Sequence, residues 1–141
     1  MIVADSNLIA SCVLESTATE SARNLLSADS EWYVPRLWRY EVTNILATMI
    51  KAKRLSAELA TSVFAALVES LKAYEREPMP DDVFSLVSEH GITGYDAQFV
   101  ALARELHCPL YTQDKELLDK FPDCAKCRAC HYRESFHSSL P

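Results

Sequence analysis

Glycine is nearly absent from this sequence, since the 141 residues include only 2, Gly91 and Gly94. Loops that wrap a phosphate are rich in glycine, so P-loop and dinucleotide-binding functions are excluded. The sequence also lacks an apolar run of membrane-spanning length, and its start, MIVADSN, has no basic segment before the apolar residues, unlike a signal peptide. We therefore expect a cytoplasmic protein without membrane contact.

Positive charge is scarce as well. The chain has 14 Lys and Arg against 20 Asp and Glu, a net charge of −6, which argues against non-specific coating of nucleic acid. An acidic metal site beside a local basic patch stays open. Cysteine occurs 5 times, and this odd number favours reduced thiols over a secreted disulfide framework.

Short apolar runs alternate with stretches of helical spacing, and the length fits one domain. Pro35 is expected in the first turn of a helix, where its missing N–H has no partner. Ser56 is expected to cap the next helix, and Gly91 to end another. The order predicts a three-layer α/β/α domain with a central, mainly parallel sheet. The expected strands are 2–4, 32–34, 74–77 and 108–112, and the expected helices include 6–14, 20–28, 35–53 and 115–121.

Four acidic residues, Asp5, Glu41, Asp96 and Asp114, stand at or near the ends of these elements. Asp5 and Asp114 could cap the helices that follow them. Glu41 lies early in its helix, where the helix dipole favours an anion. Thr93 and Asp96 have the spacing of a capping box. Taken one at a time, each acid is better explained by structure than by catalysis.

Taken together, the four acids point to one cleft. Asp5 and Asp114 each follow a predicted strand, and ligands gather beyond the carboxyl ends of parallel strands. Asp96 begins the helix before the second of these strands, and Glu41 borders the apolar stripe of its helix, with Asn44 on the same border. Clustered carboxylates repel one another unless a cation neutralises them, and an all-oxygen set suits Mg²⁺ or Mn²⁺ better than Zn²⁺. Phosphodiester hydrolysis is the chemistry that such a site favours.

Four segments carry a family resemblance: IVADSN, LWRYEVTNIL, ITGYDAQFVALA and LYTQD. They hold the four acids in the order and at the spacing of the PIN domain. The chain resembles the VapC-type toxin ribonucleases of bacterial and archaeal toxin–antitoxin pairs. The match runs from residue 1 to about residue 121, so we expect a PIN-like nuclease domain at 1–121 and a C-terminal tail at 122–141, which either adds a final edge strand or stays unstructured.

The resemblance implies an endoribonuclease that depends on Mg²⁺ or Mn²⁺ and hydrolyses RNA with water, without a protein nucleophile. It also implies a homodimer, and inhibition by a small cognate antitoxin that occupies the groove beside the active site. Ser6 lacks a His base and is not expected to act as a nucleophile. The implied metal-site acids are Asp5, Glu41 and Asp96, completed by Asp114, and the supporting polar residues are Asn7, Asn44 and Thr112.

Basic residues on or beside the helix of Glu41 could guide RNA. For any single one, a solvated helix face is a slightly better explanation. Contacts to phosphates would make RNA binding fall as salt is added. The residues are Arg36, Arg39, Lys51, Lys53 and Arg54.

The tail contains the run CAKCRACH, in which Cys124, Cys127, Cys130 and His131 have spacings that can grip Zn²⁺. Structural zinc sites normally draw their second ligand pair from a distant segment, and here all the ligands fall together. Free thiols in a final strand or an unstructured tail are the simpler expectation. Zinc is kept as a secondary alternative.

Two other functions remain open. A phosphohydrolase of the haloacid dehalogenase type uses an aspartate after its first strand, but it needs a second aspartate where this chain has Asn7. A PIN-fold module that serves only protein contacts would not need the acidic quartet. Retained biological effect after Asp5→Asn and Asp96→Asn substitution would favour this non-catalytic alternative.

Overall fold

The computed structural model describes residues 1–14, 27 and 29–127. The helix predicted at 20–28 falls outside these residues, apart from residue 27. In chain order the described elements are β1 (Ile2–Ala4), α1 (Ser6–Ser11), β2 (Trp32–Pro35), α3 (Trp38–Lys51), α4 (Ala57–Leu71), the short 3-10 helix η1 (Lys72–Tyr74), β3 (Glu75–Arg76), α5 (Pro80–His90), α6 (Gly94–Glu105), β4 (Leu110–Tyr111), α7 (Lys115–Lys120) and β5 (Ala125–Lys126).

The strands form one parallel sheet in the order β3-β2-β1-β4-β5. In its centre, Val3 is in register with Tyr33 of β2 and with Leu110 of β4. A central parallel strand is covered on both faces, which is why β1 is apolar at every position and all three of its residues are buried.

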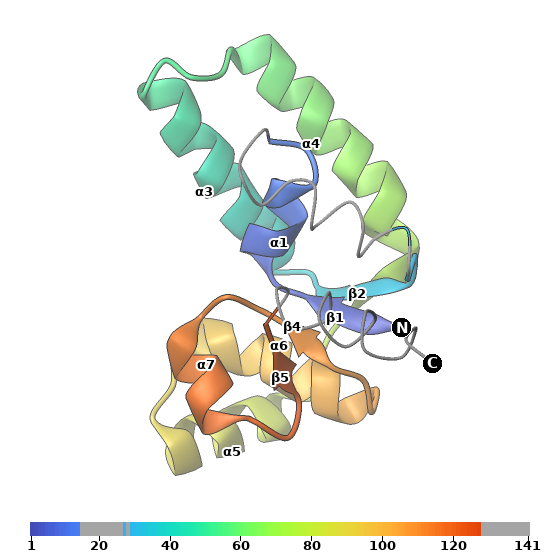
Figure 1. The fold of residues 1–141 in the computed structure, drawn as a ribbon, viewed down its shortest axis with the longest axis vertical. Coiled ribbons are helices and arrows are strands. Elements are labelled where there is room, and N and C mark those ends of the chain that lie inside the picture. Colours follow the sequence, from blue (N-terminus) through green and yellow to red (C-terminus); the bar gives the residue numbers. More distant parts are fainter. Residues whose placement is uncertain (15–26, 28, 128–141) are drawn as a thin grey trace, which may run out of the picture.

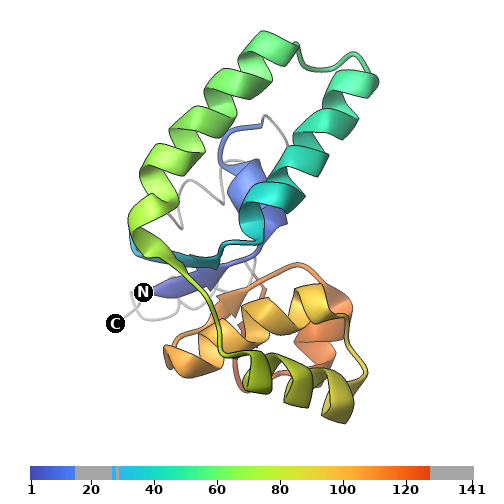
Figure 2. The ribbon, with the colours of Figure 1, turned by 180° about the vertical axis from the view of Figure 1, so that it is seen from behind.

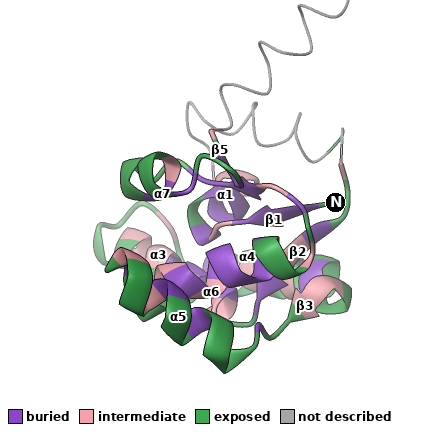
Figure 3. Cartoon of the chain, turned by 90° about the horizontal axis from the view of Figure 1, so that it is seen from below, coloured by how far each residue is buried: buried purple, intermediate pink, exposed green. Residues whose placement is uncertain are grey.

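Helices cover both faces of the sheet. Figures 1 and 2 show α1, α3 and α4 on one side and α5, α6 and α7 on the other. Each layer has its own apolar core, one around Trp38 of α3 and one around Leu102 of α6. In Figure 3 the central strands are buried, whereas the outer surfaces of α5 and α7 are largely exposed. The predicted three-layer α/β/α class is confirmed.

The order in which parallel strands are added to the sheet switches sides at β1. From β1 the strands step outward through β2 to β3, and the later strands β4 and β5 lie on the other side of β1. Such a switch point leaves a crevice beyond the carboxyl ends of the two strands. Asp5 follows β1 directly, and Thr112 and Asp114 follow β4, so the fold carries these residues to one edge.

Several local predictions are confirmed. Ser56 caps α4 by accepting a hydrogen bond from the Leu59 amide. Gly91 ends α5 in the left-handed conformation, at φ 64°, where a side chain would be strained. Thr93 caps α6 by accepting from the Asp96 amide.

Other boundaries differ from the predictions. Pro35 is not in the first turn of a helix, because it is the last residue of β2 and pairs with Arg76 of β3; α3 begins at Trp38. The first helix ends at Ser11 rather than at residue 14. The tail segment does not differ in this way, because its residues Ala125–Lys126 form β5, which pairs with β4 at the edge of the sheet. No helix in the described part of the chain combines the length and apolar character needed to cross a membrane.

Candidate active site

Asp5 ties the ends of two central strands to the first helix. Its amide donates to the carbonyl of Tyr111 in β4, with N and O 3.3 Å apart. Its carboxylate Oδ1 accepts from the Leu8 amide at 2.7 Å and so caps α1. The structural role expected of an aspartate at this position is therefore present, and the half-buried carboxylate still lies at the switch point.

Glu41 reaches the same edge from α3. Its side chain is half buried, and its Oε1 accepts a hydrogen bond of 3.3 Å from the hydroxyl of Ser6, a buried residue of α1. Burial raises the pKa of Glu41, and the negative charges of Asp96 and Asp5 raise it further, while the bond from Ser6 opposes the rise. Glu41 is thus held where ionisation is costly, close to two other acids.

Asp96 comes from the opposite helical layer, in the first turn of α6. Its amide donates to Thr93 Oγ1 at 3.1 Å. Burial raises the pKa of Asp96, as do the charges of Asp114 and Glu116, while a hydrogen bond with Thr93 lowers it. The capping box and the acidic edge therefore share one residue.

Asp114 is exposed and caps α7, with Oδ1 accepting from the amides of Glu116 at 2.8 Å and Leu117 at 3.3 Å. Its own amide donates to Thr112 Oγ1 at 3.0 Å. Thr112 is one of the few buried polar residues, with 2% of its surface exposed. Thr112 thus fixes the turn that carries Asp114.

Electrostatic coupling links the four acids across the two helical layers. The charges of Asp5 and Asp96 act on Glu41, and the charge of Asp114 acts on Asp96. Within residues 1–14, 27 and 29–127, no three Asp, Glu, His or Cys side chains lie close enough together to hold a metal ion as they stand. The acids are neighbours at one edge of the sheet, and their role as metal ligands stays a prediction.

The donor set suits a hard divalent cation. All four groups are carboxylates, and such ions prefer oxygen ligands. Among the described residues, neither Glu41 nor Asp96 forms a salt bridge with a Lys or Arg. Half-buried carboxylates with raised pKa values and no paired cation are stabilised by a bound metal.

The supporting residues differ in how they are placed. Thr112 is engaged at the site through the Asp114 amide. Asn7 and Asn44 have exposed side chains on α1 and α3, and their support of the site stays a prediction. The residue missed from the sequence is Ser6, whose hydroxyl holds Glu41. Its signal was a polar side chain within the apolar face of a short helix.

The basic residues predicted to guide RNA fall into different positions. Arg36 is exposed beside the start of α3. Arg39 is paired with Glu75 of β3, through Nε at 2.5 Å and Nη2 at 3.1 Å, so it has a structural role. Lys51 lies about 15 Å along α3 from Glu41, with Lys53 and Arg54 just beyond. RNA binding by these residues stays a prediction.

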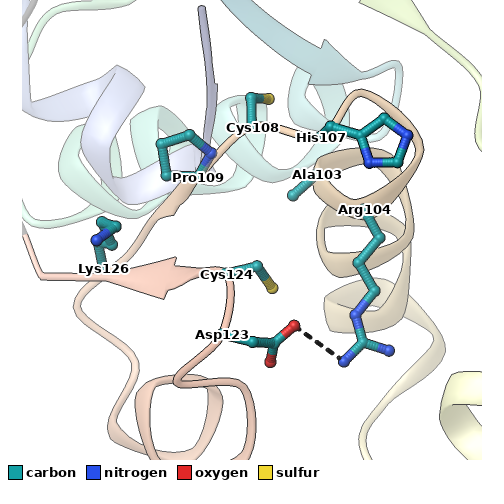
Figure 4. A pocket seen from close by; sticks show the side chains of 8 residues that line it. All are labelled: Ala103, Arg104, His107, Cys108, Pro109, Asp123, Cys124 and Lys126. Atoms are coloured by element: carbon teal, nitrogen blue, oxygen red, sulfur yellow. Dashed lines mark hydrogen bonds and ion pairs between the residues drawn. The ribbon is translucent and has the colours of Figure 1, made fainter.

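A separate pocket of about 410 Å³ opens at the opposite edge of the sheet, where Cys108 precedes β4 and Cys124 precedes β5. Figure 4 shows Cys124 next to an ion pair between Arg104 and Asp123, whose atoms are 3.4 Å apart, and Cys108 farther from it, beside Pro109 and His107. Burial raises the pKa of both thiols, which disfavours the thiolate form that zinc needs. Two predicted zinc ligands, Cys130 and His131, lie outside the described residues.

Comparison with known proteins identifies relatives over most of the chain. The sequence profile of the PIN domain matches residues 3–120. Ribonuclease VapC3 of Pyrobaculum aerophilum is 32% identical over 124 residues, covering 86% of this chain and 95% of that protein. Exonuclease VapC9 of the same organism is 33% identical over 81 residues, covering 57% of this chain and 60% of its own length.

Solved structures with the same fold are more distant in sequence. The crystal structure of PAE2754 from Pyrobaculum aerophilum superposes with a TM-score of 0.73 at 22% identity, covering 94% of this chain and 87% of that one. The crystal structure of FitAcB from Neisseria gonorrhoeae gives a TM-score of 0.69 at 15% identity, covering 92% of this chain and 99% of that one. These similarities concern the fold alone.

Proposed function

The chain belongs to the PIN domain family and is of the VapC type, and from this premise we propose that it is an endoribonuclease dependent on Mg²⁺ or Mn²⁺. The observation that carries the proposal is the coupling of Glu41 with Asp96. These two half-buried acids come from helices on opposite faces of the sheet. The pKa of each is raised by burial and, in addition, by the negative charges of nearby acids. Neither acid has a salt-bridge partner among the described residues, so a bound cation would offset the cost of burying their charges.

In this proposal Asp5, Glu41 and Asp96 hold the metal, and Asp114 completes the set. A bound divalent ion would neutralise charge on the scissile phosphodiester and activate water for its attack. The contribution of the chain is to hold the acids ready: Ser6 orients Glu41, Thr93 fixes the turn of Asp96, and Thr112 fixes the turn of Asp114.

The partners follow from the family and from charge. The substrate is RNA. Positive charge for its phosphates comes from basic residues on or near α3, namely Arg36, Lys51, Lys53 and Arg54. We also propose that the chain works as a homodimer and is held inactive by a small antitoxin protein. Membership of the PIN family sets aside the haloacid dehalogenase alternative.

The experiment that tests the proposal compares circular and linear RNA of one sequence, incubated with the purified chain with and without magnesium. An endonuclease cuts the circle, and the Asp5→Asn variant should leave both substrates intact. Cleavage that continues in EDTA would disprove metal dependence. Cleavage of both forms by the Asp5→Asn variant would point to a contaminant or to another site.

One relative is named as an exonuclease, so exonuclease activity is the second candidate function, and the same assay tests it. If only the linear RNA is shortened, and the circle survives in magnesium, the chain is an exonuclease. If the wild-type chain cuts neither substrate, and its biological effect survives in Asp5→Asn and Asp96→Asn variants, it is a non-catalytic interaction module.

A further inference from the structure

Two exposed aromatic residues lie close to Asp96, one of the four acids of the candidate active site. Phe84 of α5 is 69% exposed and Tyr95 of α6 is 66% exposed, although large aromatic rings are usually well buried. Both line a pocket of about 470 Å³ between the beginnings of these helices, together with Glu77, Thr93 and Gln98. The helices lie beside each other in Figure 2. The volume of this pocket is in the range of small-ligand pockets.

Along the chain, the residues that line the pocket adjoin Asp96 of the candidate active site. Thr93 lines the pocket and also accepts the hydrogen bond from the Asp96 amide. Tyr95 directly precedes Asp96 in the chain, so their Cα atoms are about 3.8 Å apart. A nucleotide whose phosphate is held at Asp96 would therefore have lining residues of the pocket close by.

The charge at the pocket selects which part of a nucleotide enters. Glu77 lines it, and Asp81 and Asp82 stand exposed in the first turn of the neighbouring α5. These acids repel phosphates but accept hydrogen bonds from amino groups. The pocket therefore suits a neutral, flat group that carries N–H donors.

From these observations we propose that the pocket binds one unpaired base of the RNA substrate, stacked on Tyr95 and Phe84. Glu77 accepts a hydrogen bond from an exocyclic amino group, which adenine, cytosine and guanine have and uracil lacks. Gln98 supplies both a donor and an acceptor for the same edge. The pocket thereby sets a base preference next to the scissile phosphate. This inference rests on the proposed function, because RNA is its ligand.

The test measures binding apart from cleavage. The Asp5→Asn chain, in magnesium, is titrated into a short uridine RNA that carries a single 2-aminopurine, placed at each position in turn. Stacking should quench the fluorescence at one position. At that position adenosine, cytidine or guanosine should bind more tightly than uridine. Loss of one ring should weaken binding by about 5- to 150-fold.

Several substitutions sharpen this measurement. Added to Asp5→Asn, Tyr95→Ala, Tyr95→Leu and Phe84→Ala should weaken binding and abolish the quench, whereas Tyr95→Phe should keep both. Leu59→Ala, at an exposed apolar residue of α4, is the matched surface control and should change nothing. Glu77→Gln should reduce the preference for amino-bearing bases over uracil on the order of tenfold.

The outcomes separate this inference from the proposed function. Unchanged affinity in Tyr95→Ala, or equal affinity of Tyr95→Leu and Tyr95→Phe, overturns the base pocket. If Tyr95→Ala keeps its RNA affinity but changes from dimer to monomer in light scattering, the base pocket is also overturned. Tyr95 then belongs to a protein contact. If the wild-type chain leaves RNA uncut but binding depends on Tyr95, the nuclease function fails and the pocket stands.

Discussion

Ser6 and Glu41, 35 residues apart in the sequence, are joined by a hydrogen bond of 3.3 Å from the serine hydroxyl to Oε1. The bond links α1 to α3 within one helical layer. Because Ser6 is only 4% exposed, its hydroxyl has few alternative partners. It favours the ionised form of Glu41 and so opposes the effect of burial on the pKa of Glu41.

Removing that hydroxyl should shift the pH dependence of RNA cleavage. In Ser6→Ala the pKa of Glu41 rises further, because its charged form loses a hydrogen-bond donor. The acid limb of the pH–rate profile should move to higher pH, and cleavage below neutral pH should fall by roughly tenfold, in line with a hydrogen bond to a charged group. Ser6→Thr should restore the profile. A uniform loss of rate without a pH shift would show that Ser6 only supports packing.

Neutral substitutes for the coupled acids should stabilise the protein while stopping cleavage. The pKa values of Glu41 and Asp96 are raised in the folded chain. The folded state therefore binds more protons than the unfolded state, and the free energy of unfolding falls as pH rises from the ordinary carboxyl pKa through the raised one. At neutral pH, Glu41→Gln and Asp96→Asn remove this loss, so their Tm in EDTA should exceed that of the wild type by up to a few degrees.

The same comparison at acid pH is its control. Below the ordinary pKa of a carboxyl group, about 4, both acids are protonated in either state, and the gain in Tm should vanish. Asp114→Asn should give no such gain, because Asp114 is exposed and caps α7, a role that asparagine also fills. A fall in Tm at neutral pH in Glu41→Gln would mean that its carboxylate is needed for folding.

Local signals made the capping predictions succeed. Ser56, Gly91 and Thr93 act within one helical turn of their position, so their side chain or backbone conformation decides the helix end regardless of the rest of the chain. The apolar run of β1 was equally informative, since a strand buried on both faces needs no partner to be recognised.

Long-range contacts explain what the sequence alone could not predict. Pro35 satisfies the rules both for the first turn of a helix and for the end of a strand, and its pairing with Arg76, far along the chain, decides between them. Arg39 was interpreted as a possible RNA contact because nothing near it in the sequence reveals Glu75 as its partner. The bond from Ser6 to Glu41 was missed for the same reason.

Magnesium should stabilise the wild-type chain. An ion that binds only the folded state adds about 2.7 kcal/mol when its concentration is a hundredfold above Kd. Tm measured against magnesium concentration should rise by several degrees in the wild type and by much less in Asp96→Asn. Because protons compete with the metal for Glu41 and Asp96, the effect should weaken as pH falls. An equal rise in both proteins would place the ion elsewhere.

Arg36 and Arg39, close together at the start of α3, should respond differently to alanine substitution. Glu75 binds Arg39 through two hydrogen bonds and also accepts one from the indole of Trp38 at 2.9 Å. Burial raises the pKa of Glu75, but these bonds and the charges of Arg39 and Arg36 lower it below its ordinary value. Arg39→Ala leaves this half-buried carboxylate without its main partner and should lower stability by about 1–3 kcal/mol.

Arg36→Ala should instead leave stability within about 0.5 kcal/mol of the wild type, as for other exposed positions. If Arg36 contacts one phosphate, its loss should weaken RNA binding and reduce the slope of log affinity against log salt by about 0.7, the value for a single strand. Urea unfolding and fluorescence anisotropy at several salt concentrations measure the two effects. A salt slope that changes in Arg39→Ala but not in Arg36→Ala would contradict this assignment. It would show that Arg39, although bound by Glu75, is the arginine that contacts RNA.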